Sequence, residues 1–285
     1  MWHYWDYNTV WRMIHYLRNR EFAMLTAKGF NSQFYKRNMR CHHPDHFKFF
    51  KTITGFESRS RPFNFYCSLA KYQEGIPFVT KENRKDVLKQ WTAENYKFIT
   101  GYDFLLDIDV KHHDLIYVAY ESAKLVKDVF DHRKVPYELV FSGRGFHFKI
   151  PYSVIPRLSL DPRDGSNLFS VLGSLANKMH DSISEYIDTS IYDSRRLCKV
   201  PFSIALYKYP DGERAYLCRP FADVVDFNKF NLSDFEIENI GDIRKYQVEP
   251  MFNCGDTMDF MRLLDDFDVD YYNYVEEEKV ENSER

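Results

Sequence analysis

The chain has 285 residues, a net charge of −3, 44% hydrophobic residues and a high aromatic share of 18%. This composition is that of a globular protein with a sizeable core, and no run approaches the roughly 20 apolar residues that cross a bilayer, so no membrane association is expected. The N-terminus lacks a basic segment followed by an apolar one, and the five cysteines are scattered, so we expect an intracellular protein of the cytoplasm or nucleoid.

Charge is distributed unevenly along the chain. Residues 256–285 contain eleven acidic and three basic residues, a net charge of −8, which leaves +5 on residues 1–255. Residues 11–51 carry nine Lys or Arg against two acids, interleaved with phenylalanine and tyrosine. Basic residues mixed with aromatic ones suit a nucleic-acid strand, whose phosphates are charged and whose bases stack. A helical layer with an ordinary basic outer face explains the same pattern equally well.

The first hundred residues predict an N-terminal α/β module. Apolar residues at helical spacing predict a helix over 9–28. Residues 62–82 are expected to form a strand and a loop, because Gly75 and Pro77 interrupt them. A second helix is expected over 82–96.

The most informative segment is the run Phe-Leu-Leu-Asp-Ile-Asp-Val at 104–110. In a strand, side chains alternate between the two faces, so Asp107 and Asp109 stand side by side opposite the apolar residues. Two carboxylates on one face repel each other unless a cation lies between them, and their hard oxygen atoms suit magnesium or manganese. The alternative is an exposed edge strand with two solvated acids.

The following segments complete the predicted core. They are, in chain order, a helix over 114–132, strands over 137–141 and 146–150, a helix over 166–186 and a strand over 195–204. Pro136 ends the first of these helices, and Pro201 indicates a bulge or an edge in the last strand. The order strand, helix, hairpin, helix, strand predicts an α+β fold with a mixed sheet.

Residues 142–145, Ser-Gly-Arg-Gly, join the two central strands. The backbone N–H groups of this turn, the Ser142 hydroxyl and the Arg144 guanidinium can all reach a phosphate. In the next strand, the alternation that turns the phenylalanines inward places His147 on the opposite face. Taken singly these are weak signals, since glycines are common in hairpins and one strand histidine is usually structural.

Asp188 follows the second predicted helix of the core, and Arg196 and Lys199 lie just downstream. A third carboxylate would complete a metal site, and the nearby cations would hold a triphosphate. A helix C-terminus followed by a basic surface strand is the alternative.

Together the three segments resemble the archaeo-eukaryotic primase superfamily, and within it the catalytic small subunit of primase. The run at 104–110 matches the acidic pair of the family, and Ser-Gly-Arg-Gly-Phe-His is a compact form of its second motif, with one residue fewer between serine and histidine. The third motif resembles Asp188 through Ser203, and Arg20-Glu21-Phe22 resembles a motif near the N-terminus. The resemblance covers about residues 9–210.

The resemblance implies a primase-polymerase catalytic fold, with a mixed, RRM-like β-sheet flanked by helices and an N-terminal α/β module. We expect one catalytic domain over residues 1–264. In it, a basic and aromatic module over about 1–100 precedes a catalytic core over about 101–215. An acidic tail over 265–285 follows.

The resemblance also implies a template-dependent nucleotidyltransferase, a DNA primase or primase-polymerase that makes short RNA or DNA primers on single-stranded DNA from NTPs or dNTPs. A primase large subunit is a candidate partner. The implied catalytic residues, which would hold two Mg²⁺ or Mn²⁺ ions, are Asp107, Asp109 and Asp188. The implied nucleotide-binding residues are Ser142, Arg144, His147, Arg196 and Lys199.

Two features depart from the family pattern. A histidine is common two residues after the last serine, but this chain has Ala205 there, so the contact is missing or comes from another group such as Lys208. A cysteine-rich zinc module is also absent from the sequence. The cluster Cys41, His42, His43 and His46 has ligand-like side chains, but such turns are usually polar loops, and a structural zinc ion is not expected.

Two other functions compete with this interpretation. A metal-dependent nuclease also uses clustered carboxylates, but it leaves the turn at 142–145 and the later basic stretch unexplained. A non-catalytic nucleic-acid-binding or scaffold subunit with a primase-like fold fits Ala205 but not the presence of all three aspartates. The sequence leaves open the sugar preference and whether the chain starts primers or only extends them.

Overall fold

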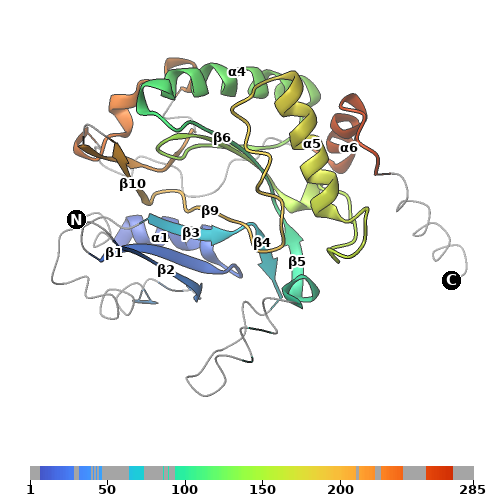
Figure 1. Ribbon diagram of the computed structural model, residues 1–285, viewed down its shortest axis with the longest axis horizontal. Coiled ribbons are helices and arrows are strands. Elements are labelled where there is room, and N and C mark those ends of the chain that lie inside the picture. The colour runs from blue at the N-terminus through green and yellow to red at the C-terminus, as the bar shows by residue number, and fades with distance from the viewer. Residues whose placement is uncertain are drawn as a thin grey trace, which may run out of the picture.

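The computed structural model describes residues 7–28, 32–39, 41, 43, 45–46, 64–73, 86, 89, 94–209, 212–221, 226–239 and 255–271. Two four-stranded sheets lie one above the other, and helices cover the outer side of the upper one in Figure 1. No helix within these ranges has the length and apolar character needed to cross a bilayer.

The upper sheet, called the central sheet below, has the strand order β12-β7-β8-β6. Its strands are β6 (Phe104–Asp109), β7 (Glu138–Phe141), β8 (Gly145–Ile150) and β12 (Arg219–Pro220). In the β6–β8 register, Asp107 lies opposite His147 and Asp109 opposite Gly145. The three central strands therefore confirm the segments expected at 104–110, 137–141 and 146–150.

Every strand pair in the described part of the chain is antiparallel, so the expected mixed sheet is wrong while the α+β class is confirmed. The helix after β6 does return the chain so that β7 runs parallel to β6. The hairpin strand β8 then lies between these two strands and is antiparallel to both. A parallel pair never forms because the hairpin fills the space between its two members.

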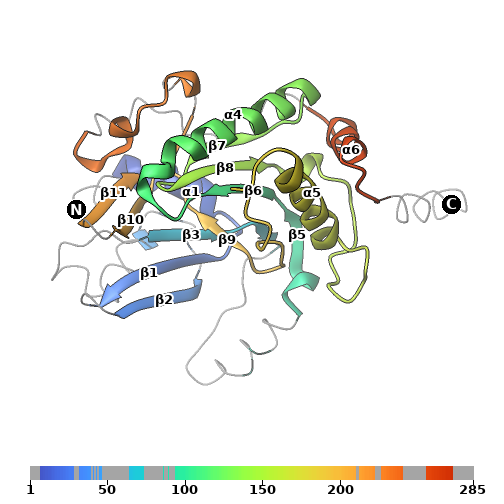
Figure 2. The same cartoon turned by 45° about the horizontal axis from the view of Figure 1, so that its top comes forward.

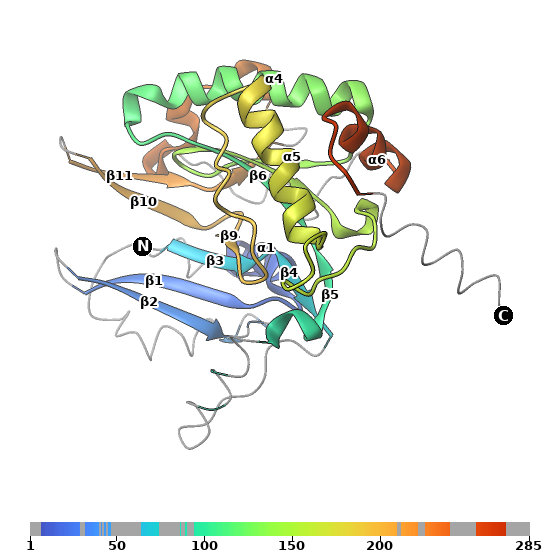
Figure 3. The ribbon, with the colours of Figure 1, turned by 45° about the vertical axis from the view of Figure 1, so that its right-hand side comes forward.

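Helices cover one face of the central sheet, as Figures 1 and 3 show. They are α4 (Ile116–Arg133), α5 (Leu168–Ser182) and α6 (Thr257–Asp266). The α4 ring of Phe130 packs edge-on against Phe148 with centroids 5.6 Å apart, and Phe260 of α6 packs against Phe104 at 6.1 Å. The apolar alternation of β6 and β8 therefore faces these helices, which leaves the polar alternation for the opposite face.

Aromatic rings fill the end of this core nearest β12, which accounts for much of the high aromatic content. The rings of Phe141 and Phe235 lie 4.6 Å apart and those of Phe146 and Phe230 lie 5.2 Å apart. Edge-on and tilted pairs of this kind add to the free energy of burial. The other rings of the cluster are Tyr120, Phe221 and Phe227.

The lower sheet, called the N-terminal sheet, has the order β2-β1-β3-β9, and Figure 2 shows β1, β2 and β3 side by side. Its strands are β1 (Phe22–Lys28), β2 (Ser32–Met39), β3 (Asn64–Ser68) and β9 (Leu197–Lys199), and α1 (Tyr7–Leu17) precedes them. The helix expected over 9–28 is thus wrong beyond Leu17. Asn19 takes a left-handed conformation with φ of 60°, which breaks the helix, and Phe22 then enters the core of the sheet.

The strand expected over 195–204 is divided into two. After β9, Pro201 and Phe202 form a turn in which Phe202 has φ of 68°, and β10 (Ile204–Tyr209) pairs with β11 (Gly212–Leu217) in a separate hairpin. Proline lacks the N–H that a continuous strand would need at this point. The consequence is that β9 belongs to the N-terminal sheet while β10 turns away from it.

The remaining expectations for the N-terminal hundred residues are met in part. Strands β3 and β4 (Ala70–Tyr72) lie within the segment 62–82, and β4 pairs with β5 (Ile99–Tyr102). Most of the helix expected over 82–96 lies outside the described residues. Its described residues Asp86, Lys89 and Glu94 are helical, and a 3₁₀ helix at Asn95–Phe98 overlaps its end.

A buried ion pair and a buried hydrogen bond connect the two layers. Arg20 donates to Asp103 at 2.6 Å and to the Ser68 carbonyl at 3.0 Å, across the junction of the two sheets. The Tyr16 hydroxyl of α1 donates to Glu138 of β7 at 2.5 Å. Glu138 also pairs with Lys149 at 3.1 Å, so the polar face of the central sheet rests on the N-terminal layer.

Three of the four arginines of the segment 11–51 whose side chains the structure describes have structural partners, whereas Arg18 is exposed. Glu21 accepts two hydrogen bonds from Arg37 at 2.9 and 3.0 Å, and Arg12 donates to the Asn8 carbonyl at 3.2 Å. With Arg20, these contacts favour the structural explanation for this part of the segment. The lysines of the segment and Arg40 lie outside the described side chains.

The remaining short elements lie in the connections between strands and helices. They are the 3₁₀ helices at His113–Leu115, Tyr152–Val154, Phe227–Lys229, Leu232–Phe235 and Ile237–Asn239. Helix α6 begins with a capping box in which Asp256 and Asp259 satisfy each other's backbone N–H groups. Most of the acidic tail expected over 265–285 lies outside the described residues.

Candidate functional site

The acidic pair of β6 meets the third predicted aspartate through the main chain. The Asp188 N–H donates to the Asp107 carbonyl at 2.8 Å, and the Asp109 N–H donates to the Tyr186 carbonyl at 3.1 Å. An antiparallel bridge joins Ile108 to Ile187 between these two bonds. The segment after α5 therefore lies against the free edge of β6 and brings Asp188 to the acidic pair, 79 positions along from Asp109.

The electrostatics of Asp107 show that three carboxylates gather here. Desolvation, followed by the charges of Asp109 and Asp188, raises the pKa of Asp107 to about 7. Its Oδ1 atom is buried without a hydrogen-bond partner among the described residues. A carboxylate oxygen in this condition is costly unless a cation or a proton compensates it.

Arginines compensate the other two carboxylates. The Arg144 Nε donates to Asp109 Oδ1 at 2.8 Å, and its Nη2 donates to Oδ2. Asp188 Oδ2 forms an ion pair with Arg196 Nη2 at 3.6 Å, and Asp188 Oδ1 accepts a hydrogen bond from the Ser190 hydroxyl at 2.6 Å. In this arrangement, no three His, Cys, Asp or Glu side chains of the described ranges converge closely enough to hold a metal ion.

The donor set nevertheless fits a divalent ion. All three side chains offer hard oxygen atoms, and one oxygen of Asp107 has no hydrogen-bond partner among the described residues. The negative charges of Asp109 and Asp188 also make the ionised form of Asp107 less favourable. Release of Asp109 and Asp188 by their arginines would free further oxygen atoms at the same place. The residues that would hold Mg²⁺ or Mn²⁺ are therefore Asp107, Asp109 and Asp188.

The turn at 142–145 lies directly beside the acidic pair. Gly145 is paired with Asp109, and a Cβ atom there would come within 1.8 Å of the Ile108 carbonyl oxygen. Gly143 has φ of +95°, and a Cβ atom there would come within 2.6 Å of Ala205 Cβ. Both glycines are thus required by close approach of the backbone, which is what places Arg144 against Asp109.

His147 faces the same side as the acidic pair. Its imidazole is buried, and its Nε2 atom lies 3.4 Å from Asp107 Oδ1. Desolvation, together with the charges of Lys199 and Lys149, lowers the pKa of His147 to about 3. The imidazole is therefore neutral and can offer a hydrogen bond but no positive charge.

Lys199 reaches the site from the N-terminal sheet. Its Nζ donates to the Ser142 carbonyl at 3.0 Å and lies 3.9 Å from the ring centroid of Tyr207. Desolvation lowers the pKa of Lys199 to about 8. The site thus combines residues of both sheets: aspartates, the turn and His147 from the central sheet, and Lys199 from β9.

The structure brings together all eight residues singled out in the sequence. Ser142 takes part through its carbonyl oxygen, which accepts hydrogen bonds from Lys199 and Tyr207. Sequence reasoning missed Tyr207, which contacts both Lys199 and Arg144. It also missed the pairing of 186–188 with β6. The alternation from Ala205 to Tyr207 along a strand was the available signal for Tyr207.

The cluster of Cys41, His42, His43 and His46 lies only in part within the described residues. Cys41 is buried, and desolvation raises the pKa of its thiol well above its ordinary value. His43 is exposed and lies 3.3 Å from Asp45. His42 lies outside the described residues, so the four ligand-like side chains are not seen together. Nothing in the described part of the chain supports a zinc site here.

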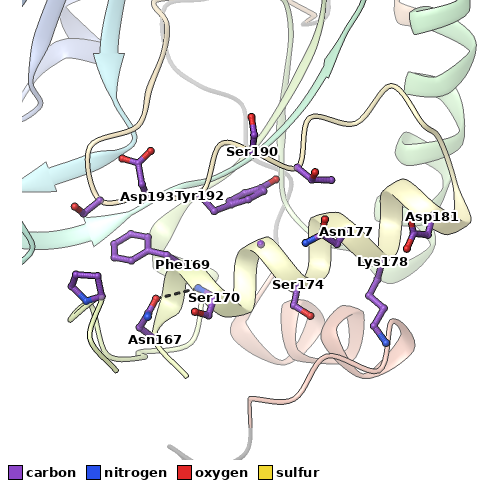
Figure 4. A pocket seen from close by; sticks show the side chains of 14 residues that line it. Asn167, Phe169, Ser170, Ser174, Asn177, Lys178, Asp181, Ser190, Tyr192 and Asp193 are labelled. Carbon is purple, nitrogen blue, oxygen red and sulfur yellow. Dashed lines mark hydrogen bonds between the residues drawn. The ribbon is translucent and has the colours of Figure 1, made fainter. Parts of the chain in front are cut away.

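An open cavity of about 730 Å³ adjoins the site between α5 and the segment 189–194 (Figure 4). Ser190 lines this cavity and donates a hydrogen bond to Asp188, so the cavity adjoins the acidic cluster at Ser190. Several of its lining residues carry hydroxyl or amide groups, and its charged members are Lys178, Asp181 and Asp193. None of the eight predicted site residues lines it.

Comparison with known proteins gives low similarity only. No family model and no curated protein matches the chain. The crystal structure of primase RepB′ has 9% identity and a TM-score of 0.39, and the match covers 76% of this chain and 56% of that chain. The polymerase domain from Mycobacterium tuberculosis Ligase D in complex with DNA has 11% identity and a TM-score of 0.48, covering 83% and 88%. These scores do not assign a function, so the assignment depends on the side chains described above.

Proposed function

We propose that the chain is a template-dependent nucleotidyltransferase, a DNA primase or primase-polymerase that makes short RNA or DNA primers on single-stranded DNA. The observation that carries the proposal is the meeting of three carboxylates from β6 and the 186–188 segment with the turn at 142–145. Clustered carboxylates beside phosphate-binding donors are what phosphoryl and nucleotidyl transfer require. The proposed setting is intracellular, in DNA replication.

In the proposed reaction, a 3′-hydroxyl attacks the α-phosphorus of an incoming NTP or dNTP, and pyrophosphate leaves. Asp107, Asp109 and Asp188 would hold two Mg²⁺ or Mn²⁺ ions. When bound, such ions lower the pKa of the attacking hydroxyl and neutralise the charge of the triphosphate and of the leaving group.

The turn and the cations supply the triphosphate contacts in this proposal. Arg144, released from Asp109, provides a planar guanidinium that suits two phosphate oxygens at once. Lys199 provides a desolvated point charge, and neutral His147 donates one hydrogen bond. Arg196, released from Asp188, adds a further positive charge, and Ser142 belongs to the same turn.

One observation favours a second candidate, a non-catalytic nucleic-acid-binding subunit. Arg144 and Arg196 already neutralise two of the three carboxylates, so the site is electrostatically satisfied without an ion except at Asp107. The catalytic proposal requires these ion pairs to open. The two candidates therefore differ in whether divalent ions displace the arginines.

The test is synthesis on single-stranded DNA, with and without a supplied primer, with Mg²⁺ or Mn²⁺ and labelled ATP or dATP. The parent chain is compared with the double variant Asp107→Asn/Asp109→Asn. Asp128→Asn, an exposed change on α4, serves as the control for charge. Products from the parent and control but not from the double variant support the proposal. Unchanged synthesis by the double variant would contradict it.

The same assay separates the remaining possibilities. Extension of a supplied primer without unprimed synthesis would indicate a polymerase that extends only, or one that needs a large subunit to start. Absence of synthesis with retained single-strand binding would favour the non-catalytic candidate. The labelled nucleotide that is incorporated identifies the preferred sugar.

A further inference from the structure

Tyr207 on β10 is the side chain around which the two cations of the turn are arranged. The Lys199 Nζ lies 3.9 Å from the centroid of its ring, and the Arg144 guanidinium carbon lies 5.1 Å from it. Both distances are within the range in which a cation is attracted to the negative face of an aromatic ring. One half-buried ring therefore contacts two cations that come from different sheets.

The hydroxyl of Tyr207 holds the turn itself. It donates to the Ser142 carbonyl at 3.2 Å, and Lys199 donates to the same oxygen at 3.0 Å. The Cε2 atom of Tyr207 would lie 3.0 Å from a Cβ atom on Gly143. The side chain of Tyr207 therefore contacts both the backbone of the turn and the charged groups on either side of it.

The neighbouring position explains why the ring can reach the turn. Ala205 is fully buried, and its Cβ atom would lie only 2.6 Å from a Cβ atom on Gly143. A large side chain at 205 would collide with the turn, whereas position 207, two residues further on the same strand face, has room for a ring. From this strand it is therefore Tyr207, not residue 205, whose side chain reaches the turn. The side chain of Lys208, the group suggested by the sequence for the contact missing at 205, lies outside the described ones.

The ring of Tyr207 stabilises the charges of Lys199 and Arg144 in addition to packing against the turn. Lys199 is buried, and its pKa is lowered by desolvation, so a ring face beside it offsets part of the lost hydration. Arg144 is shared between Asp109 and the ring. If Arg144 leaves Asp109 for a phosphate, the ring remains as the contact that keeps the guanidinium beside the turn.

We infer that Tyr207 is a positioning residue for the nucleotide triphosphate: its ring orients Arg144 and Lys199, and its hydroxyl fixes the Ser142 carbonyl between them. The inference rests on the proposed function, since it assumes that these cations bind the triphosphate. It assigns Tyr207 no contact with the reacting atoms. Its loss should weaken binding of the triphosphate more than it slows the chemical step.

The test replaces the ring without changing its shape. Tyr207→Phe removes only the hydroxyl, and phenylalanines with one, two and three ring fluorines at the same position then weaken the negative face stepwise. Binding of a nucleoside triphosphate and of inorganic tripolyphosphate is measured by calorimetry, without template. We expect each affinity to fall progressively along the series, by about fivefold in total. Tyr207→Leu, which removes the ring, should show at least the same loss.

Tyr152 provides the matched control. Its ring also carries a cation, Lys71 at 4.7 Å, but it is 38% exposed and belongs to the junction with Gly101 rather than to the site. Tyr152→Phe and its fluorinated series should leave both affinities unchanged. Thermal unfolding of every variant is recorded, and the fluorinated series keeps the test valid even if Tyr207→Leu fails to fold.

The outcomes distinguish this inference from the proposed function. Stepwise loss at position 207 but not at 152 supports the inference. Binding by the parent that is insensitive to fluorination at 207 overturns the inference and leaves the proposed function standing. A parent chain that binds neither nucleoside triphosphate nor tripolyphosphate overturns both.

Discussion

His147 of β8 lies directly opposite Asp107 of β6, and its Nε2 atom is 3.4 Å from Asp107 Oδ1. The imidazole nevertheless does not neutralise this carboxylate. Burial holds the pKa of His147 at about 3 and raises that of Asp107 to about 7. Near neutral pH the pair therefore consists of a neutral ring and a carboxyl group that is only part-ionised. The negative charge of Asp107 can therefore be compensated by a proton or by a bound cation.

The first prediction concerns the stability of the metal-free protein. The pKa of Asp107 is higher in the folded chain, about 7, than its ordinary value of 3.8. The folded state therefore binds the proton of Asp107 more tightly than the unfolded state does. The contribution of this proton to stability is fully present below about pH 4 and is lost as pH rises through about 7. At pH 8, Asp107→Asn should raise the free energy of unfolding by about 1–3 kcal/mol, because the side chain is only partly exposed.

Chemical denaturation in the presence of a chelator, at pH 5 and pH 8, measures this effect. The gain for Asp107→Asn should be larger at pH 8 than at pH 5. Asp128→Asn, an exposed change of the same charge, should show no such difference. An equal gain at both pH values would contradict the raised pKa.

The second prediction concerns competition between Arg144 and a divalent ion. Arg144 binds both oxygen atoms of Asp109, so it must release at least one before they can ligate an ion. Arg144→Gln should therefore tighten Mn²⁺ binding in the absence of nucleotide, by about fivefold for an ion pair that is one-third exposed. The same variant should bind nucleoside triphosphate more weakly.

Calorimetric or paramagnetic titration with Mn²⁺ measures the change. Arg163→Gln is the control, because Arg163 forms a similar pair with Asp161 outside the site. Weaker Mn²⁺ binding by Arg144→Gln would show that the arginine and the ion do not compete for Asp109.

The third prediction concerns the charge of Lys199. Its pKa is lowered to about 8, so the free protein loses this positive charge as pH rises through that value. Affinity for nucleoside triphosphate should therefore fall above about pH 8, by up to about tenfold per pH unit for one proton. Lys199→Arg stays charged over the same range, so its affinity should be flat between pH 7.5 and 9.5. A parallel fall in both proteins would exclude Lys199 as the titrating group.

The fourth prediction concerns the turn. A Cβ atom at position 145 would lie 1.8 Å from the Ile108 carbonyl oxygen, so Gly145→Ala should separate β8 from β6 and cost about 3 kcal/mol or more. At Gly165, where no atom lies within 4 Å of an added Cβ, alanine should be neutral or slightly stabilising. Thermal unfolding compares the two variants. A native-like midpoint for Gly145→Ala would mean that the strands are further apart than described.

Sequence periodicity was sufficient to locate β6, β7 and β8 of the central sheet, but it predicted neither β12 nor the antiparallel pairing of β6 with β8. The alternation of Phe146 and Phe148 with His147 fixed which side chains share the acidic face. It failed for the helix expected over 9–28, because the partner of Arg20, Asp103, lies 83 positions away. A contact so distant leaves no local signal, and the strand propensity of the segment from Phe22 was outweighed by helical spacing before it.

The candidate site shows the same division. The two aspartates of β6 and the turn are local motifs and were predicted from short runs of sequence. Asp188 could be proposed as a third carboxylate, but the backbone bridge of Ile108 to Ile187 that brings it near could not. Tyr207 was missed because its alternation with Ala205 shows that the two share a strand face, but not that this face lies against the turn at 142–145.

The polar contacts between the layers limit how the chain can be shortened. A fragment over residues 101–215, which holds every proposed ligand, would lose the guanidinium that pairs with Asp103 and the phenol that donates to Glu138. In such a fragment Asp103 would lose its buried ion-pair partner, a loss that costs about 3–5 kcal/mol, while Glu138 would keep Lys149 but lose one hydrogen bond. A minimal autonomous unit must therefore begin upstream of Tyr16, and any circular rearrangement must keep α1 attached to the central sheet.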